Sequence, residues 1–543
     1  MNKRRASDAH LVEELRRLAD NPAPDHALRD LSHRTQTPLH RLHSLTTFFP
    51  QLGSLRAEET RVCGDLSCHL AEPGLLETLR AAGKRVSSSS CLGLCDQPAA
   101  VAIGDHVYGG FTSQHAVEAI ANVTGAAAIT AHSITRFIDP HDGGAHYATL
   151  RGFVAAGDPD SIIKELDASG LRGFGGAGFP TARKWQLVRA AHATEKFVVC
   201  NADESEPGTF KDRFLLEHYP HLIIEGLVIA ALVVGARKAY VFLRHEYARQ
   251  RERLVAALTA ARAANAVGAS VCGSECAVDI EIFDSPGGYI CGEETALLEA
   301  MEGKRAEPRN RPPFPGVIGL WGQPTLINNV ETLAWVPTIL TRGGAWFAQQ
   351  GCNGASGLKF IALSGHVTRP GVYEIPLGLT VRELIEEHGG GMSGQRRLKA
   401  FAPGGASSGF LPAACSNIAL DFQPLAAAGS MLGSGAVIAL AEGTCMVDAA
   451  LSGLRFFRNE SCGKCVPCRV GSEKLVGLAE ALARGVARAA DLDLVRELAN
   501  TMEATSICGL GQAAPNPLLS VLKHFPDEVD AHLHGHCPAR VCR

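Results

Sequence analysis

Two groups of cysteines are the residues of this sequence whose spacing most clearly indicates chemistry. One group has the pattern C-x2-C-x2-C in the run ESCGKCVPCRVG, and a fourth cysteine follows after 39 intervening residues in SICGLG. Three closely spaced thiolates can wrap one face of an iron–sulfur cubane while a distant fourth closes the other, whereas a zinc site more often uses two C-x2-C pairs. We therefore predict a [4Fe–4S] cluster, with a zinc or structural site as the alternative, at Cys462, Cys465, Cys468 and Cys508.

The second group lies near the amino terminus and offers two pairs of thiols. The pairs have the spacings C-x4-C and C-x3-C and stand 22 residues apart, so that each pair could hold one iron of a [2Fe–2S] cluster. A thioredoxin-like redox pair or plain buried thiols are the alternatives, but no C-x2-C occurs in this region. The predicted ligands are Cys63, Cys68, Cys91 and Cys95.

A glycine-rich loop, GFGGAG at residues 173–178, matches the pattern G-x-G-x-x-G. The preceding run SIIKELDASGLR has the character of a helix and a turn, so the strand–loop–helix context of a Rossmann site is missing. Glycines still let backbone N–H groups approach a phosphate or a flat ring, and a tight turn is the alternative. Phe179 could stack on such a ring, and Lys184 could neutralise a phosphate.

Two acidic runs complete the candidate site. NADESEPGTFKDR follows the apolar strand KFVVC directly, and a strand end of this kind often contacts a ligand. In YICGEETALLEAMEGKR, Glu293 and Glu294 open a predicted helix, whose positive amino-terminal end favours their charge. Taken alone, either run is more typical of a solvated turn or a cation site.

The elements that must position these residues form several units, because 543 residues are too many for one hydrophobic core. A helical lead-in over residues 6–49 precedes a compact α/β unit that starts at Thr60, and an Ala/Gly-rich linker is predicted at residues 122–133. Strand and helix patterns alternate over residues 150–345, a small mixed unit follows the loop at 351–357, and helical patterns return from Leu451. The predicted fold class is multidomain α/β.

Composition excludes several classes of protein. With 46% hydrophobic residues, 20% charged residues and a net charge of -4, the chain resembles an ordinary soluble protein rather than a disordered or nucleic-acid-binding one. No apolar stretch follows the basic start, and the most apolar run, Leu222 to Val234, is too short to span a bilayer. We expect a cytoplasmic protein without direct membrane contact. The tail HLHGHCPARVC could bind a metal, although a disordered end is the simpler interpretation.

Taken together and in this order, the motifs resemble the NADH-binding flavoprotein subunit of respiratory complex I and its relatives in NAD-reducing hydrogenases and NAD-dependent formate dehydrogenases. The resemblance covers residues 145–525 and is carried by GLRGFGGAGFPTARKW, NADESEPGTFKDR, GGYICGEETALLEAMEGKRAEPRNRPPFP with QPTLINNVETL, and the two cysteine runs at the carboxy-terminal end. It implies four domains: a helical lead-in with a thioredoxin-like [2Fe–2S] domain at 1–125, an FMN- and NAD(H)-binding domain at 140–345, a ubiquitin-like β-grasp (SLBB) domain at 355–445 and a helical [4Fe–4S] domain at 446–530.

The resemblance also implies which residues contact each cofactor. FMN would lie among Gly173, Gly175, Gly176, Ala177, Gly178, Lys184, Asn201, Asp203, Glu204, Tyr289, Gly292, Glu293, Asn328, Asn329 and Thr332. NAD(H) would contact Phe179, Glu206, Glu294, Arg311 and Phe314, with the two phenylalanines on either side of the adenine. The sequence departs from relatives at Phe174, Ala182 and Leu187, where Arg, Gly and an aromatic residue are frequent, and this concerns nucleotide affinity more than the reaction.

The function implied is electron transfer between NAD(H), FMN and the clusters, with hydride transfer carried by FMN and no catalytic side chain required. The fused amino-terminal domain and the runs FAPGGASSGFLPA and SICGLGQAAPNPLLSVLKHFPDEV resemble the beta subunit of a molybdenum or tungsten formate dehydrogenase. The expected partner is then the catalytic alpha subunit, with a small iron–sulfur subunit as a further candidate. The alternatives are a hydrogenase diaphorase subunit, a fused complex I subunit, and a non-catalytic iron–sulfur scaffold or redox sensor.

Overall fold

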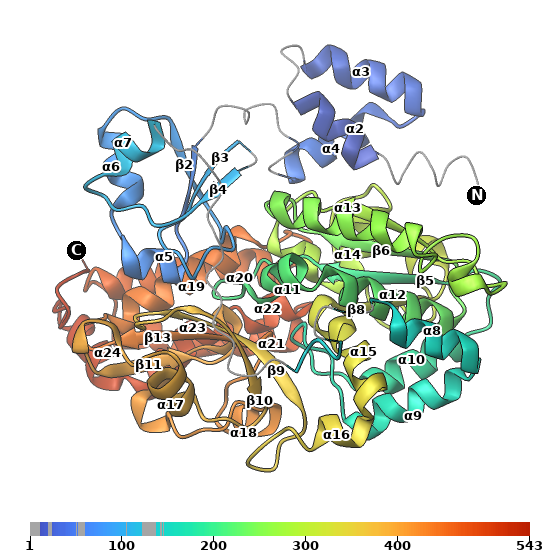
Figure 1. Ribbon diagram of the computed structural model, residues 1–543. Helices are drawn as coiled ribbons and strands as arrows, with labels where there is room; N and C mark the ends of the chain where they lie inside the picture. Colours follow the sequence, from blue (N-terminus) through green and yellow to red (C-terminus); the bar gives the residue numbers. More distant parts are fainter. Residues whose placement is uncertain are drawn as a thin grey trace.

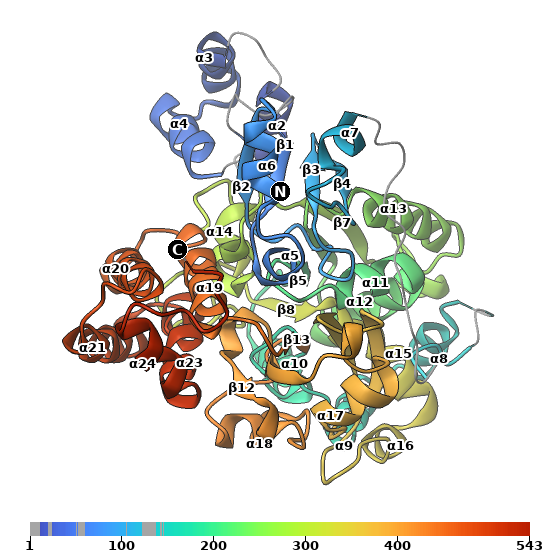
Figure 2. The ribbon, with the colours of Figure 1, turned by 90° about the vertical axis from the view of Figure 1, so that its left-hand side faces the viewer.

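The computed structural model of the chain describes residues 11–19, 24–49, 52, 60–104, 106–121, 137–141, 144 and 146–542. The predicted linker at 122–133 lies outside these residues. The described part contains three β-sheets that are covered and joined by helices, which confirms the multidomain α/β fold class. In Figures 1 and 2, the amino-terminal helices and the first sheet lie on one side of a larger body that holds the other two sheets and the carboxy-terminal helices.

The amino-terminal helices dock on this body. They are α2 (Leu11–Ala19), α3 (Pro24–Thr35) and α4 (Leu39–Phe48). Leu11, Val12 and Leu15 form one apolar face of α2 and are buried. Two arginine side chains donate to carbonyls of the body, from Arg16 to Ser285 at 2.8 Å and from Arg41 to Gly303 at 2.8 Å.

The first sheet belongs to the compact unit that carries the amino-terminal cysteines. Its strand order is β2-β1-β3-β4, with β1 parallel to β2 and antiparallel to β3. The elements are β1 (Thr60–Cys63), α5 (Leu66–Ala71), α6 (Leu75–Ala81), β2 (Val86–Ser89), β3 (Val101–Ile103), β4 (His106–Tyr108) and α7 (Ala116–Ala121). Cys63 ends β1, Cys68 lies in α5, and the loop after β2 carries Cys91 and Cys95.

The second sheet is fully parallel and has the order β7-β6-β5-β8. Parallel strands are covered on both faces, which explains the continuous apolar runs FVVC and YVFL. The strands are β5 (Phe197–Ala202), β6 (Lys238–Leu243), β7 (Asp279–Asp284) and β8 (Thr325–Asn329). The helices are α8 (Ala148–Ala156), α9 (Pro159–Ser169), α10 (Thr181–Ala190), α11 (Lys211–His218), α12 (Pro220–Val234), α13 (Ala248–Ala263), α14 (Glu294–Met301), α15 (Val330–Arg342), α16 (Gly344–Ala348) and the 3-10 turns η2 (Val271–Gly273), η3 (Tyr289–Gly292) and η4 (Leu320–Gly322).

The third sheet is mixed and has the order β10-β9-β13-β11-β12, with the parallel pair β9 and β13 at its centre. The elements are β9 (Leu358–Gly365), β10 (Gly371–Pro376), α17 (Val381–Glu383), the π-helical turn η5 (Leu384–His388), η6 (Ser393–Gln395), β11 (Leu398–Ala402), η7 (Ala406–Ser408), β12 (Leu411–Pro412), η8 (Ala413–Cys415), α18 (Phe422–Ala427) and β13 (Ala436–Ala441). One serine of this unit, Ser434, contacts Thr209 of the second unit, with 2.7 Å between the hydroxyl oxygens.

The carboxy-terminal part is helical, as predicted, and consists of α19 (Met446–Asn459), α20 (Val466–Ala483), α21 (Ala489–Thr505), α22 (Gly509–Ala513), α23 (Asn516–His524) and α24 (Pro526–Leu533). The expectation of a disordered end is wrong, because the tail folds back and brings His532 and Cys542 against Cys445. In the described part of the chain no single helix is long and apolar enough to cross a membrane; α11 and α12 together are, but they are bent by 95°.

Candidate functional site

The carboxyl ends of β5 and β8 form one edge of the parallel sheet, the usual place for ligands in such sheets. Asn201 and Asn329 are direct partners across these strands, and Asn328 pairs with Cys200. Asn201 donates to the Gly292 carbonyl at 2.8 Å, while Asn328 accepts from the Trp185 indole at 2.9 Å. Three of the predicted FMN residues, Asn201, Asn329 and Gly292, therefore meet at this edge.

The glycine-rich loop lies against the same edge. It follows helix α9 rather than a strand, which confirms that it is not a Rossmann loop. A Cβ built at Gly175 would lie 3.1 Å from the Asn329 Cβ, and Gly176 and Gly178 have φ values of +126° and +63°. The Phe174 N–H donates to the Thr332 hydroxyl at 2.9 Å, which fixes the loop to the start of α15. The loop from Gly173 to Gly178, with Ala177, thus runs beside the strand end, and at Gly178 it packs against the Phe422 ring, which leaves no room for a Cβ.

The acidic loop after β5 contains two buried carboxyl groups in different situations. Asp203 accepts from the Ser205 hydroxyl at 3.1 Å, but in the described part of the chain its Oδ1 has no hydrogen bond of ordinary length. Burial raises the pKa of Asp203 to about 7. Glu204 is fully engaged, since its carboxylate accepts from the backbone N–H groups of Asp212 at 2.9 Å and Arg213 at 3.0 Å. Glu204 therefore caps α11, and its predicted contact with FMN stays a prediction.

A cluster of charges lies at the start of α14. Glu293 caps this helix by accepting from the N–H groups of Thr295 and Ala296, both at 2.9 Å. Glu294 pairs with Lys184 at 3.1 Å and Arg311 at 3.2 Å. Burial alone would raise the pKa of Glu294, but Lys184 and Arg311 outweigh it and hold the pKa below its ordinary value. The predicted phosphate partner Lys184 and the predicted nucleotide residues Glu294 and Arg311 thus form one charged group.

Two aromatic rings on neighbouring segments are exposed. Phe179 is 41% exposed and Phe314 is 57% exposed, and both lie beside arginines, Arg183 and Arg311 respectively. The loop that follows Phe314 contacts α10, the helix that begins two residues after Phe179, because a Cβ built at Gly316 would lie 3.2 Å from a methyl group of Val188. Exposed rings of this kind are available to stack on a planar ligand.

A loop of the third unit reaches the acidic loop, which the sequence did not indicate. The Ser407 N–H donates to the Glu206 carboxylate at 2.9 Å, and the Ser407 hydroxyl lies 3.4 Å from the Tyr289 hydroxyl. Burial raises the pKa of Glu206 to about 7. The glycine- and serine-rich run APGGASSG is the sequence signal that could have located this contact.

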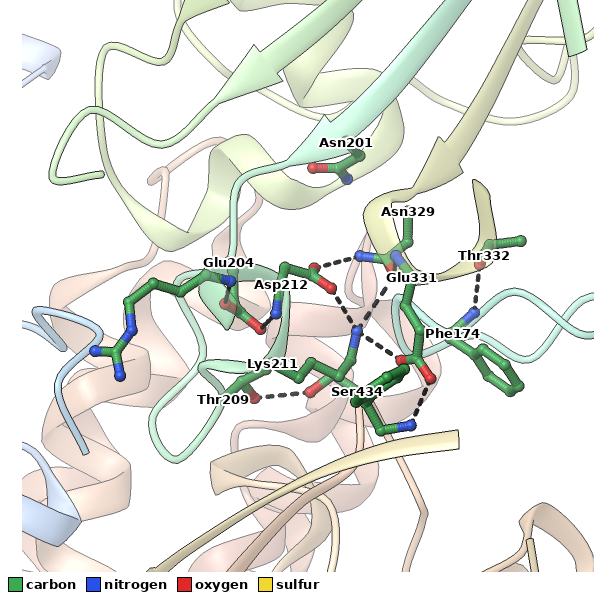
Figure 3. A network of polar contacts seen from close by, with 12 residues as sticks. Phe174, Asn201, Glu204, Thr209, Lys211, Asp212, Asn329, Glu331, Thr332 and Ser434 are labelled. Carbon is green, nitrogen blue, oxygen red and sulfur yellow. Dashed lines mark hydrogen bonds and ion pairs between the residues drawn. The ribbon is translucent and has the colours of Figure 1, made fainter. Parts of the chain in front are cut away.

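A buried network of charges lies beside Asn329 at this edge of the sheet (Figure 3). The Lys211 ammonium projects between three oxygens, those of Asp212 at 2.7 Å, Glu331 at 2.9 Å and Asn329 at 3.2 Å. Glu331 also accepts from Lys359 at 3.0 Å. Burial alone would lower the pKa of Lys211, but the two carboxylates outweigh it and raise the pKa, whereas burial lowers the pKa of Lys359 to about 8. The network was not predicted, and it holds Asn329 in place.

Three of the four cysteines predicted to hold the [4Fe–4S] cluster lie at helix starts, and Cys462 precedes them in the loop before α20. Cys465 is the N-cap of α20 and Cys508 is the N-cap of α22, while Cys468 lies in the first turn of α20. A Cβ built at Gly511 in α22 would lie 2.9 Å from the Cys468 Cβ, so the distant fourth cysteine is brought beside the motif. Burial raises the pKa of the Cys468 thiol to about 11 and that of Cys508 to about 12, and binding to a metal is what deprotonates such thiols. Four cysteines on converging segments are the usual ligands of an iron–sulfur cluster. The donor set therefore fits a [4Fe–4S] cluster.

The amino-terminal cysteines gather in a buried group. The sulfurs of Cys91 and Cys95 are 3.5 Å apart, and the neighbouring thiols of Cys68 and Cys91 raise the pKa of Cys63. Backbone N–H groups approach these sulfurs, including Gly208 N–H to Cys95 at 3.3 Å. Because Gly208 belongs to the acidic loop, this thiol group lies directly beside the candidate flavin site.

Comparison with known proteins decides which family this architecture represents. Family profiles match the Nuo51 FMN-binding domain at residues 166–338, an SLBB domain at 360–411 and the NADH-ubiquinone oxidoreductase-F iron-sulfur binding region at 448–532. The NADH-quinone oxidoreductase F-subunit 2 of Rhizobium meliloti (strain 1021) is 44% identical over 402 residues, which are 74% of this chain and 96% of that protein. The chain belongs to the F-subunit family of NADH-quinone oxidoreductases.

Other members of this family and a solved structure are similar to the chain as well. The NADP-reducing hydrogenase subunit HndC of Solidesulfovibrio fructosivorans is 41% identical over 412 residues, or 75% of this chain and 84% of that protein. A chain of an NAD+-reducing [NiFe]-hydrogenase in the H2-reduced state has a TM-score of 0.88 at 33% identity, with 98% of this chain and 94% of that chain covered. Membership in the family confirms the predicted FMN, NAD(H) and [4Fe–4S] cofactors of a diaphorase-type subunit.

Proposed function

We propose that FMN lies in the cradle made by the glycine-rich loop, Asn201 and Asn329, and that the chain passes electrons between NAD(H) and iron–sulfur centres. The close approach of Gly175 to Asn329 at the carboxyl edge of the parallel sheet carries this proposal. The position of the buried Asp203 supports it, because a Cβ built at Gly292 would lie 3.7 Å from the Asp203 carboxylate, which brings this side chain to the same edge of the sheet. When bound, FMN supplies a ring that takes a hydride and releases electrons one at a time.

The side chains around the cradle bind and orient rather than act as acids or bases. Lys184 and Arg311 lie near the start of α14, where they would contact the phosphates of a nucleotide in place of their present partner Glu294. Phe179 and Phe314 would hold the adenine between them, which the exposure of both rings supports. The buried Phe174 closes the inner side of the loop against water.

We further propose that electrons leave the flavin through two clusters. Cys462, Cys465, Cys468 and Cys508 would hold the [4Fe–4S] cluster, which is supported by the contact that brings the start of α22 beside Cys468. Cys63, Cys68, Cys91 and Cys95 would hold a [2Fe–2S] cluster, supported by their burial and by the short distance between Cys91 and Cys95. A cavity of about 420 Å³ is lined by residues of both cysteine groups, Cys91 and Cys462, and by Tyr289.

The proposed partner is the catalytic alpha subunit of a cytoplasmic molybdenum or tungsten formate dehydrogenase, with a small iron–sulfur subunit as a further candidate. The fused amino-terminal unit and the loop that carries Ser407, a run similar to formate dehydrogenase beta subunits, support this choice. A hydrogenase diaphorase subunit is the second candidate, favoured by the structural match that covers 98% of the chain. A fused complex I subunit is the third, and a non-catalytic scaffold or redox sensor would be the alternative of another class.

Substitution at Gly175 tests the FMN cradle. Gly175→Val places branched methyl groups where even a Cβ lies 3.1 Å from Asn329, so flavin content should fall at least about tenfold, as expected when a bulky group enters a close-packed contact. Gly152→Val is the matched control, because a Cβ at this exposed position in α8 meets no atom within 4 Å. Full flavin content in Gly175→Val would contradict the placement of FMN.

Purification of the tagged chain from its native host tests the partner. Mass spectrometry of the co-purifying subunits, together with NAD+ reduction by formate and by hydrogen, separates the candidates. The formate proposal expects a molybdenum- or tungsten-containing subunit and formate-dependent reduction. Hydrogen-dependent reduction with a nickel–iron subunit would favour the second candidate instead, and a complex without flavin or NADH oxidation would favour the scaffold.

A further inference from the structure

The carboxy-terminal tail, which the flavin chemistry does not use, forms a cluster of potential metal ligands with the start of α19. The cluster consists of Cys445, His532, Cys537 and Cys542, whose ligand atoms all lie within 4.8 Å of one another. Among the described residues it is the only group of three or more such side chains gathered this closely. We propose that these three cysteines and one histidine bind a single structural zinc ion.

The distances fit one tetrahedral ion. Zn–S bonds of about 2.3 Å and Zn–N bonds of about 2.0 Å place two sulfurs about 3.8 Å apart and a sulfur and a nitrogen about 3.5 Å apart in a tetrahedron. The Cys445 sulfur lies 3.6 Å from the Cys542 sulfur and 3.5 Å from Nε2 of His532. In a [4Fe–4S] cubane the four ligands bind four different irons and therefore lie farther apart. This group of three cysteines and one histidine is too compact to hold a cubane.

The histidine is already oriented as a ligand. His532 is only 1% exposed, and its Nδ1 lies 2.7 Å from the Glu528 carbonyl, one turn earlier in α24. A proton on Nδ1 donated to that carbonyl leaves the lone pair of Nε2 directed at the Cys445 sulfur. This second contact fixes both the tautomer and the ring orientation, as is usual for histidines that bind metal.

The ion would tie three separate parts of the chain together. Cys445 is the N-cap of α19, His532 lies in α24, and the two remaining cysteines lie in the tail beyond it. Glu528 also links α24 to these parts, because it accepts from the Met446 N–H at 3.1 Å and pairs with Lys399 of β11. The tail also passes close to the loop after α20, since a Cβ built at Gly485 would lie 2.5 Å from the Gly535 Cα. Zinc would therefore fasten the tail to the helical domain and the third sheet.

Elemental analysis of the full-length holoprotein tests the proposal. The wild type should contain about one zinc ion per chain, and the variant Cys537→Ser/Cys542→Ser should lose at least about nine-tenths of it, because two of four ligands are gone. Cys276→Ser/Cys415→Ser, which changes two free cysteines elsewhere, is the matched control and should keep its zinc. Iron and FMN contents should be equal in all three proteins.

A measurement on the wild type covers the case in which the double variant fails to fold. Removal of zinc by a chelator should speed amide hydrogen exchange in α24 by at least about tenfold, and added Zn²⁺ alone should restore protection, since the bound ion contributes to the local folding energy. Wild-type protein without zinc, zinc retained by the Cys537→Ser/Cys542→Ser variant, or a disulfide between Cys445 and Cys542 found by peptide mapping would each overturn the proposal. So would a loss of iron in place of zinc.

Discussion

The buried network beside the flavin cradle gives the sharpest quantitative prediction. Glu331 is fully buried and contacts two ammonium groups, Lys211 at 2.9 Å and Lys359 at 3.0 Å. Its other oxygen accepts from the Phe360 N–H at 2.7 Å. Glu331→Gln keeps the shape of the side chain and removes its charge. Among the described residues, Lys211 then keeps Asp212 as a contacting carboxylate, whereas the ion pair of Lys359 is lost.

The expected loss of stability follows from these distances. At an effective dielectric constant of about 20, one pair of unit charges 3 Å apart is worth about 5 kcal/mol before desolvation. Two such pairs are lost in the variant. Part of this loss is offset, because the variant does not have to desolvate the Glu331 carboxylate. A further part is offset because Lys359, whose pKa burial lowers to about 8, can give up its proton. We expect a net loss of about 3–5 kcal/mol, the usual range when one partner of a buried pair is removed. For a unit of about 200 residues this lowers the midpoint of thermal unfolding by about 6–20 °C.

The assay compares three variants by thermal unfolding at one scan rate and by FMN content. Glu331→Gln should lose both stability and flavin, because Lys211 and Asp212 hold Asn329 of the cradle. Glu331→Gln/Lys359→Met should recover more than half of the stability, since it removes the unpaired charge. Glu442→Gln, in an exposed pair with Arg397, is the matched control and should lose less than about 1 kcal/mol. The reasoning is refuted if Glu331→Gln loses no more than this control, or if the double variant is no better than the single one.

Three further predictions concern the redox path. Cys465→Ser should abolish electron delivery to the partner while NADH–ferricyanide activity and flavin content persist; a full [4Fe–4S] signal in electron paramagnetic resonance would contradict the ligand assignment. Cys91→Ser should lose the [2Fe–2S] signal alone, and Cys272→Ser, a cysteine outside both groups, should keep it; unchanged iron in Cys91→Ser would mean that the thiols are not ligands. Glu206→Lys should narrow the preference for NADH over NADPH, chiefly through KM for NADPH, because a carboxylate repels the 2′-phosphate and an ammonium attracts it. Because burial raises the pKa of Glu206 to about 7, the wild-type preference for NADH should increase from pH 6 to pH 8 as the carboxyl group ionises. The measurement is the ratio of kcat/KM for the two nucleotides at one ionic strength, and an unchanged ratio would show that Glu206 does not face the phosphate.

The parts of the site that sequence could predict are local ones. The strand KFVVC, the acidic loop behind it and the glycine-rich loop without a Rossmann strand all depend on neighbouring residues, and the structure contains each of them. The two strand ends meet because β5 and β8 are parallel neighbours, which places Asn201 opposite Asn329. Periodicity and turn residues are sufficient to predict such features.

The parts that escaped prediction depend on contacts between distant segments. Lys359 reaches Glu331 from the next domain, and Ser407 reaches Glu206 across 201 positions of sequence. In neither pair does the sequence around one residue indicate that the other residue will contact it. The tail was expected to be disordered for the same reason, because its partner Cys445 lies 87 positions before His532. Glu204 shows a different difficulty, since a carboxylate after a strand can cap the next helix as readily as it can bind a ligand.

Anaerobic titration of the purified chain with NADH tests the central claim most directly. The account predicts about one FMN per chain, released on denaturation, and loss of its visible absorption on addition of NADH without any partner subunit, because the proposed flavin cradle and the proposed nucleotide contacts both lie in this chain. We expect full reduction of the flavin at about one NADH per flavin, and additional NADH is needed for the electrons that the clusters take up. A chain that binds FMN but is not reduced by NADH, or one purified with its clusters intact and without flavin, would contradict the account.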